Sequence, residues 1–244
     1  MTNVRMGIDI GGTGIKGAPV DITTGKLKGD RLRIPTPEPA TPDAIGATVA
    51  EIVKHFSWKG PIGATMPAVV KSGVVLTAAN IDPSWIDTDA DMLFTKTTGS
   101  QVTVLNDADA AGMAEMKFGA GKGRKGVVLM VTLGTGIGFA VFNDGVLLPN
   151  TELGHIELHG DDAEERASAR VREETDESWK KWSHGVNEYL QKIDSLLWPD
   201  LIIIGGGVSK KADKFFPHIH IRAELVAAEL LNDAGIVGAA LAAK

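Results

Sequence analysis

The chain has 244 residues, of which 43% are hydrophobic and 23% charged, and its 25 basic and 31 acidic side chains give a net charge of -6. This composition argues against intrinsic disorder and against a uniformly basic surface that would hold nucleic acid. The sequence has no cysteine, which excludes disulfides, thiolate metal sites and a cysteine nucleophile, and no apolar segment approaches the ~20 residues of a membrane span. We therefore expect a cytoplasmic protein.

The first elements of the chain are strands and turns that precede a helix. Residues 5–20 predict two strands that form a hairpin around a glycine-rich turn. A further strand is expected at 27–34, followed by a loop in which the density of proline prevents regular pairing. Thr41 is the expected N-cap and Pro42 the first residue of a helix, because the apolar residues that follow recur at helical spacing.

The rest of the chain continues the alternation of strands and helices. Buried strands are expected at 62–66, 102–105 and 201–204, and helices at 108–118, at 186–197 and from about 227 to the end. A second strand-turn-strand segment at 126–142 matches the first, because Gly-Thr-Gly-Ile recurs at an offset of 122 residues, half the chain length. We therefore predict an α/β protein with two similar halves.

The first glycine-rich turn combines residue types that suit a phosphate group. Glycines let backbone N–H groups approach an anion, threonine and lysine add a hydroxyl group and a positive charge, and aspartate can hold Mg²⁺ directly or through water. These residues are Asp9, Gly11, Gly12, Thr13, Gly14 and Lys16. The alternative is an ordinary glycine-rich hairpin, since the pattern is neither a Walker A loop nor a dinucleotide fingerprint.

Two later turns predict the same phosphate chemistry. One is the repeat of the first turn, and the other follows a buried strand and precedes a lysine-bearing helix, which is a common geometry for anion binding. Their candidate residues are Thr132, Gly134, Thr135 and Gly136, and Gly206, Gly207 and Val208.

Polar residues also stand where the predicted strands end. Asn106 and Asp107 lie between a buried strand and a helix, a place where α/β sheets present groups to ligands. Asp107 could accept a hydroxyl proton as a general base, or it could serve only as a helix cap, a role for which Asp109 competes. Glu152 and His155 lie close together in a predicted loop, which suits a polyhydroxy ligand.

In this order, the motifs resemble those of the ROK (repressor, open reading frame, kinase) sugar kinases, and more closely those of the polyphosphate glucokinases within that family. The resemblance covers essentially the whole chain and rests on residues 9–17, 104–111, 151–160 and 203–215. It implies an actin-like, hexokinase-like ATPase fold, which is ribonuclease H-like, with two α/β domains and a central sugar cleft. On this basis we expect residues 1–108 with about 226–244 to form a small domain, and residues 109–225 a larger one.

The resemblance also implies an activity, the phosphorylation of glucose or mannose at the 6-hydroxyl with Mg²⁺ and with polyphosphate, ATP or both as donor. Asp107 matches the catalytic base. The matching sugar ligands are Asn80, Asn106, Asp107, Glu152, His155 and Glu164, with Glu165 as a rival for the last position. An ATP-only kinase of another hexose and a sugar sensor without activity stay open as alternatives.

The chain departs from the family at the zinc site, which typically joins the histidine of Glu-x-Gly-His to three cysteines, so no zinc is expected. The first strand begins by about residue 5, which leaves no room for the DNA-binding domain of the family's repressors, and no nucleic acid is expected. Candidates for a polyphosphate track are Lys122, Arg124 and Lys125, and Lys210, Lys211 and Lys214, although charged runs are usually solvated surface. The protein is expected to be a monomer or a homodimer.

Overall fold

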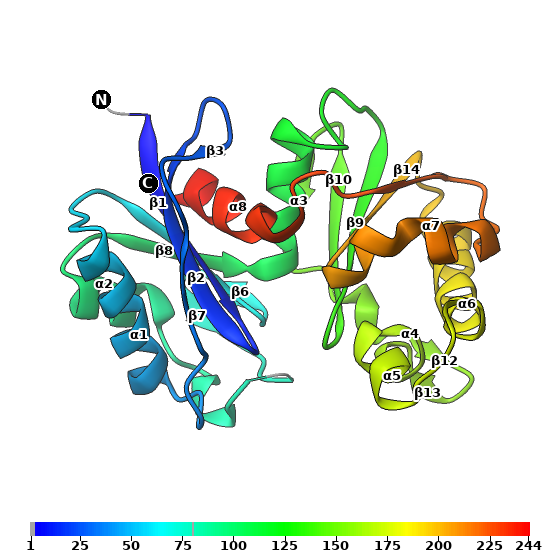
Figure 1. Cartoon of the computed structure of the whole chain (residues 1–244), viewed down its shortest axis with the longest axis horizontal. Coiled ribbons are helices and arrows are strands. Elements are labelled where there is room, and N and C mark those ends of the chain that lie inside the picture. Colours follow the sequence, from blue (N-terminus) through cyan, green and yellow to red (C-terminus); the bar gives the residue numbers. More distant parts are fainter. Residues whose placement is uncertain (1–2, 80) are drawn as a thin grey trace. The chain divides into compact units, whose positions relative to one another are not determined.

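The computed structural model describes residues 3–79 and 81–244 (Figure 1). The chain divides into two compact units. The first unit consists of Met1–Ala114 with Asp233–Lys244, and the second of Glu115–Asn232. The domain limit expected at 108/109 falls near the start of helix α3 (Asp107–Phe118), whereas the division in the structure falls inside that helix.

A mixed sheet forms the centre of the first unit. Its strands pair in the order β3 (Lys26–Leu27), β2 (Gly14–Asp21), β1 (Val4–Gly11), β5 (Ile62–Met66) and β8 (Val102–Asn106), and β4 (Leu32–Ile34) also pairs with β2. The predicted hairpin is confirmed as β1 and β2, with Asp9 opposite Lys16. The single strand predicted at 27–34 is wrong, because the chain bends at Lys28 and Gly29 and separates β3 from β4.

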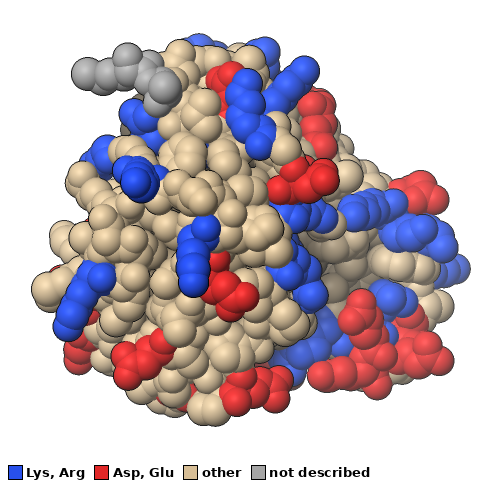
Figure 2. Space-filling model, turned by 60° about the vertical axis from the view of Figure 1, so that its left-hand side comes forward, with Lys and Arg blue, Asp and Glu red and all other residues tan. Residues whose placement is uncertain are grey.

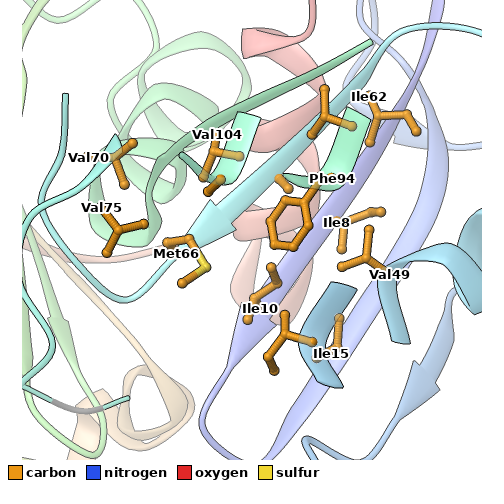
Figure 3. Close-up of a cluster of buried hydrophobic side chains, with 14 of the residues drawn as sticks. Ile8, Ile10, Ile15, Val49, Ile62, Met66, Val70, Val75, Phe94 and Val104 are labelled. Carbon is orange, nitrogen blue, oxygen red and sulfur yellow. The ribbon is translucent and has the colours of Figure 1, made fainter. Parts of the chain in front are cut away.

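Helices α1 (Pro42–His55) and α2 (Ala90–Thr98) cover one face of this sheet (Figure 1). Between them and the strands lies the apolar core in Figure 3, which includes Ile8, Ile10, Ile15, Val49, Ile62, Met66, Phe94 and Val104. Thr41 is the N-cap of α1 and Pro42 follows it, as predicted, although the Thr41 side chain makes no capping hydrogen bond. Short elements connect β5 to α2: β6 (Val70–Lys71), β7 (Val74–Val75) and η1 (Pro83–Trp85).

The C-terminal helix α8 (Ala234–Ala242) packs on the other face of the same sheet (Figure 1). The close approach requires glycine in the strands: a Cβ on Gly7 would lie 1.9 Å from the backbone oxygen of Ile236, and one on Gly63 would lie 1.7 Å from that of Ala239. The prediction of a helix from about residue 227 is wrong at its start. Residues before α8 form β15 (Glu224–Ala227) and η5 (Leu231–Asp233) instead.

The second unit repeats the sheet order of the first. Its strands pair as β11 (Val146–Leu148), β10 (Ile137–Asn143), β9 (Val127–Leu133), β14 (Leu201–Gly205) and β15. In both sheets an antiparallel hairpin is followed by parallel strands, which confirms the predicted similarity of the two halves. Helix α6 (Trp179–Leu197) covers one face; it begins earlier than predicted because Ser178 accepts a capping hydrogen bond from the N–H of Lys181.

The second unit also contains several short elements. They are η2 (Leu153–His155), β12 (Glu157–Leu158), β13 (Asp161–Asp162), α4 (Glu164–Ala167), α5 (Ala169–Glu174), η3 (Gly207–Lys211), α7 (Ala212–Phe215) and η4 (Phe216–His218). Figure 2 shows a face on which Lys and Arg side chains are interspersed with Asp and Glu. Within residues 3–79 and 81–244, no helix is both long enough and apolar enough to cross a membrane.

Candidate functional site

The carboxylate of Asp9 lies beside the first glycine-rich turn and has two side-chain partners. Lys16 Nζ lies 3.2 Å from Asp9 Oδ2, and the buried Thr65 donates its hydroxyl hydrogen to Asp9 Oδ1 at 3.1 Å. The Thr65 hydroxyl oxygen also accepts the N–H of Ile10 at 3.0 Å, which locks its orientation. The carboxylate of Asp9 is therefore fixed at the base of the turn, with a cation next to it.

Two residues that the sequence analysis missed complete this turn. Arg33 on β4 donates to the backbone oxygen of Thr13 at 2.7 Å, and Thr36 donates to that of Gly11 at 2.5 Å. Both come from the segment after β3, so only the pairing of β4 with β2 brings them here. Arg33 adds a second positive charge to a turn predicted to bind phosphate.

Asn106 caps helix α3, and this bears on the role of Asp107. The side-chain oxygen of Asn106 accepts the N–H of Asp109 at 3.0 Å, while its amide donates to the backbone oxygen of Ala68 at 3.1 Å. Asp107 is the first residue of α3 and accepts the N–H of Ala108 at 2.8 Å. Because Asn106 supplies the cap, the carboxylate of the half-buried Asp107 is not needed for that purpose.

Asp9 and Asn106 lie at the same edge of the first sheet. Strands β1, β5 and β8 are parallel, and the register aligns Ile8 with Ala64 and Ala64 with Val104. Their carboxyl ends therefore meet at one edge, where two strand spacings of ~4.8 Å separate β1 from β8. The structure thus brings the first predicted phosphate turn and the predicted base into one group. Asn80, a predicted sugar ligand, lies outside the described residues.

In the second unit, the other two glycine turns are neighbours. Gly205 pairs with Thr132 across β14 and β9, so both strands end together. Gly206 has a φ of +80°, and a Cβ there would lie 2.2 Å from the backbone oxygen of Leu133, so only glycine fits. The predicted residues Thr132, Gly134, Thr135, Gly136, Gly206, Gly207 and Val208 therefore belong to one end of this sheet.

A cavity of about 450 Å³ opens at these two turns. Its walls combine the expected residues with others from α5 and the start of α6, and they are Leu133, Gly134, Thr135, Ala169, Arg170, Arg172, Glu173, Trp179, Gly207, Val208 and Lys211. Three of these side chains are cationic and one is anionic. Arg170 is held on the turn, since its Nε donates to the backbone oxygen of Thr135 at 3.1 Å.

The sequence analysis missed Arg170, Arg172 and Trp179 although all three line the cavity. The signal available was a mixed charged run at residues 165–174, which is typical of a solvated helix face. The backbone N–H of Arg170 donates to the backbone oxygen of Gly134 at 3.1 Å, and this hydrogen bond joins α5 to the turn. Only this tertiary contact places the cationic side chains of α5 at the cavity.

Glu152, His155 and Glu164 form a cluster beside the same turn. His155 Nδ1 lies 2.8 Å from Asp162 Oδ2, and His155 Nε2 lies 3.9 Å from Glu152 Oε2. Glu164 is buried, and its Oε2 accepts the N–H of Ile137 at 3.2 Å. Its rival, Glu165, is exposed. The structure therefore brings together the three predicted sugar ligands of this unit and adds Asp162.

The electrostatics of this cluster favour bound protons. Burial raises the pKa of Glu152 above its ordinary value of 4.5; His155 opposes this effect and Glu164 adds to it. Burial alone would lower the pKa of His155, but Asp162, Glu164 and Glu152 outweigh it and raise that pKa above 6.5. The imidazole is thus surrounded by carboxylates that stabilise its charged form.

The two predicted basic clusters occupy different ends of the second sheet. Lys211 lines the cavity, and Lys214 Nζ lies 5.9 Å from the ring centroid of Trp179. Arg124 and Lys125 precede β9, whose length separates them from the Gly134 turn by about 20 Å. Arg124 forms an ion pair with Glu224. Lys122 and Lys210 are not among the residues that line the cavity.

For a metal ion, the candidate in the first unit is Asp9, whose carboxylate lies beside the predicted phosphate turn. Within the described ranges, no group of three or more His, Asp and Glu side chains could hold a metal ion. Mg²⁺ is commonly bound through one or two carboxylates together with substrate phosphates and waters. Asp9, an oxygen ligand beside a phosphate-type turn, fits this mode, with Lys16 and Thr65 as its present partners.

The sequence model of the ROK family matches residues 5–170, and the chain belongs to this family. Among its relatives, the polyphosphate glucokinase of Mycobacterium tuberculosis is 54% identical over 237 residues, which make up 97% of this chain and 89% of that protein.

Solved structures support the same assignment. The inorganic polyphosphate/ATP-glucomannokinase from Arthrobacter sp. strain KM matches with a TM-score of 0.95 and 50% identity, covering 98% of this chain and 97% of that one. The ROK family glucokinase from Streptomyces griseus, solved in complex with glucose and AMPPNP, matches with a TM-score of 0.80 and 27% identity over 97% and 98% of the two chains. The predicted family and the actin-like, hexokinase-like α/β fold are thereby confirmed.

Proposed function

We propose that this chain transfers a phosphoryl group from polyphosphate or ATP to the 6-hydroxyl of glucose or mannose. Its similarity to the polyphosphate glucokinase of M. tuberculosis and to the Arthrobacter glucomannokinase supports the reaction type and both classes of donor. The proposed sugar ligands are Asn106, Glu152, His155 and Glu164, and Asp107 is the proposed base.

The observation that carries the proposal lies within the second unit. Gly134 and Thr135 line a cavity with three cationic side chains, and two residues further on the N–H of Ile137 binds the buried carboxylate of Glu164. An anion-binding cavity and a cluster suited to hydroxyl groups therefore adjoin on one short segment. Phosphoryl transfer requires this proximity of donor and acceptor, because positioning supplies much of its rate enhancement.

The remaining chemistry is charge neutralisation and the removal of one proton. Backbone N–H groups of the glycine turns would stabilise negative charge on phosphate, and Lys16 and Arg33 in the first unit and Arg170 in the second add positive charge, each at its own turn. Asp107 would accept the hydroxyl proton as the new O–P bond forms and the bond from phosphorus to the bridging oxygen of the donor breaks, which releases ADP or a polyphosphate shorter by one phosphate. Mg²⁺, held by Asp9 and by donor oxygens, would offset further charge at the phosphates.

A coupled assay for glucose 6-phosphate tests the proposal. The protein is incubated with Mg²⁺ and glucose, in parallel with ATP and with nucleotide-free polyphosphate. We expect product with both donors. Product with ATP alone would narrow the function to a nucleotide-dependent hexokinase, and no product from glucose or mannose with either donor would contradict the proposal and favour a sugar sensor.

A further inference from the structure

Asp162 binds two of the proposed sugar ligands at the same time. Its Oδ2 lies 2.8 Å from His155 Nδ1, and its Oδ1 accepts the backbone N–H of Glu164 at 3.0 Å. His155 belongs to η2 and Glu164 begins α4, so one carboxylate connects two separate elements. The pairing of Asp162 with Glu157 in the β12–β13 hairpin fixes the backbone from which this carboxylate projects.

The contact with Asp162 determines how His155 can meet a ligand. An ionised carboxylate only accepts hydrogen bonds, so His155 Nδ1 must carry the hydrogen that it donates to Asp162. In the neutral imidazole, Nε2 is then an acceptor, and in the charged imidazole it is a donor. In both forms the ring orientation is held, and Nε2 is the nitrogen left to contact a sugar hydroxyl.

We propose that Asp162 is a positioning residue for sugar binding: it orients the His155 ring through Oδ2 and sets the start of α4, and hence Glu164, through Oδ1. This inference rests on the proposed function of the cluster as a hexose site. Asp162 acts through these two neighbours and does not itself touch the sugar.

The neighbouring Asp161 has a different partner from Asp162. Asp161 precedes Asp162 in β13, its side chain is 57% exposed, and its ion-pair partner is Arg166 at 3.7 Å. Replacing Asp161 removes the same charge from the same hairpin without touching His155 or Glu164. Asp161→Asn is therefore a matched control for Asp162→Asn.

The substitution Asp162→Asn keeps the shape but offers one acceptor where the carboxylate offers two. If the amide oxygen accepts from His155, its NH₂ group faces the N–H donor of Glu164; if the oxygen accepts from Glu164, the NH₂ group faces His155 Nδ1, and the imidazole must move its hydrogen to Nε2. We expect the dissociation constant of glucose, measured by calorimetry without a phosphoryl donor, to rise about tenfold or more. Asp161→Asn should leave it within twofold of the wild-type value.

An NMR titration of His155 gives a readout that does not depend on activity. The ionisable groups facing the imidazole are Glu152, which precedes η2, Asp162 of β13 and Glu164 of α4, and Tyr189 of α6 interacts with Asp162. Loss of the Asp162 charge should lower the pKa of His155, whereas Asp161→Asn should not. An unchanged His155 pKa in Asp162→Asn would overturn the contact on which the proposal depends.

A double-mutant cycle with His155→Gln separates positioning from a general structural role. If Asp162 acts chiefly through the imidazole, Asp162→Asn should weaken glucose binding much less in the His155→Gln background than in the wild type. Independent, multiplicative losses would overturn that role. If the wild-type protein bound neither glucose nor mannose, the proposed function would fail, and the His155 titration would still decide whether Asp162 holds the ring.

Discussion

The guanidinium group of Arg172 lies over the ring of Trp179, with its central carbon 4.1 Å from the ring centroid. Both residues line the cavity at the glycine turns. Arg172 Nη1 donates to the backbone oxygen of Glu177 at 3.3 Å, and this hydrogen bond holds the guanidinium in place at the cavity wall. A phosphate chain would meet a positive charge there, whereas a purine base would have to displace the guanidinium to stack on that part of the ring.

Arg172→Ala should therefore discriminate between the two donors. We expect the KM for polyphosphate to rise about tenfold, as the loss of a charge-assisted hydrogen bond implies, and the KM for ATP to change less. Arg222→Ala is the matched control, because Arg222 stacks on Trp198 at 4.7 Å and neither residue lines the cavity. Equal increases for both donors would contradict a donor-selective role.

Asp107→Asn should abolish turnover without abolishing sugar binding. The amide cannot accept the hydroxyl proton, so we expect kcat to fall about 100-fold or more, while the glucose dissociation constant changes only a few fold. Asp43→Asn, an exposed change in the first turn of α1, is the control for loss of one carboxylate. A kcat close to that of the wild type would remove Asp107 from the role of base.

Salt should weaken the use of polyphosphate more than the use of ATP. A long polyanion contacts more cationic side chains than a nucleotide does, and added ions screen these exposed charges. Steady-state kinetics at about 50 and 300 mM salt would give a steeper rise in the polyphosphate KM than in the ATP KM. Parallel responses would indicate that both donors use the same few charges.

The raised pKa of His155 predicts how stability depends on pH. A histidine with a higher pKa in the folded protein binds its proton more tightly there, so its stabilising contribution is full below the unfolded pKa, near 6.5. The contribution is lost as the pH rises through the folded pKa. Denaturant unfolding of the wild type and His155→Gln should therefore show a larger difference in unfolding free energy at low pH, and a difference independent of pH would refute this.

Two glycine substitutions in the first unit should differ in their effect on stability. A Cβ on Gly63 would lie 1.7 Å from the backbone oxygen of Ala239, so Gly63→Ala should push α8 away and destabilise the protein by about 3 kcal/mol. Gly12→Ala places a Cβ where no atom lies within 4 Å, and should leave stability nearly unchanged. Thermal unfolding of both variants would test whether α8 is an integral part of this unit.

Local patterns in the sequence were enough to predict much of the fold. The glycine turns, the hairpins around them and the helix after Pro42 depend on residues close together in the chain, where turn chemistry and apolar spacing are informative. The internal repeat also predicted two similar halves, and the two sheets have the same strand order. Two predicted boundaries were wrong: the strand at 27–34 is interrupted by a bend, and Glu224–Ala227, before α8, pairs with β14 as an edge strand.

The sequence by itself determined the kind of chemistry, phosphate binding and proton transfer next to a polyhydroxy ligand. Each motif consists of residues close together in the chain, so its residue types can be read without the fold. Tertiary structure alone decided which further side chains contact these motifs. Asp162, Arg33 and Arg172 reach their partners through contacts between separate elements, and Asn106 takes the helix cap that Asp107 was also able to fill. Such contacts are set by how strands and helices pack, which periodicity and spacing do not encode.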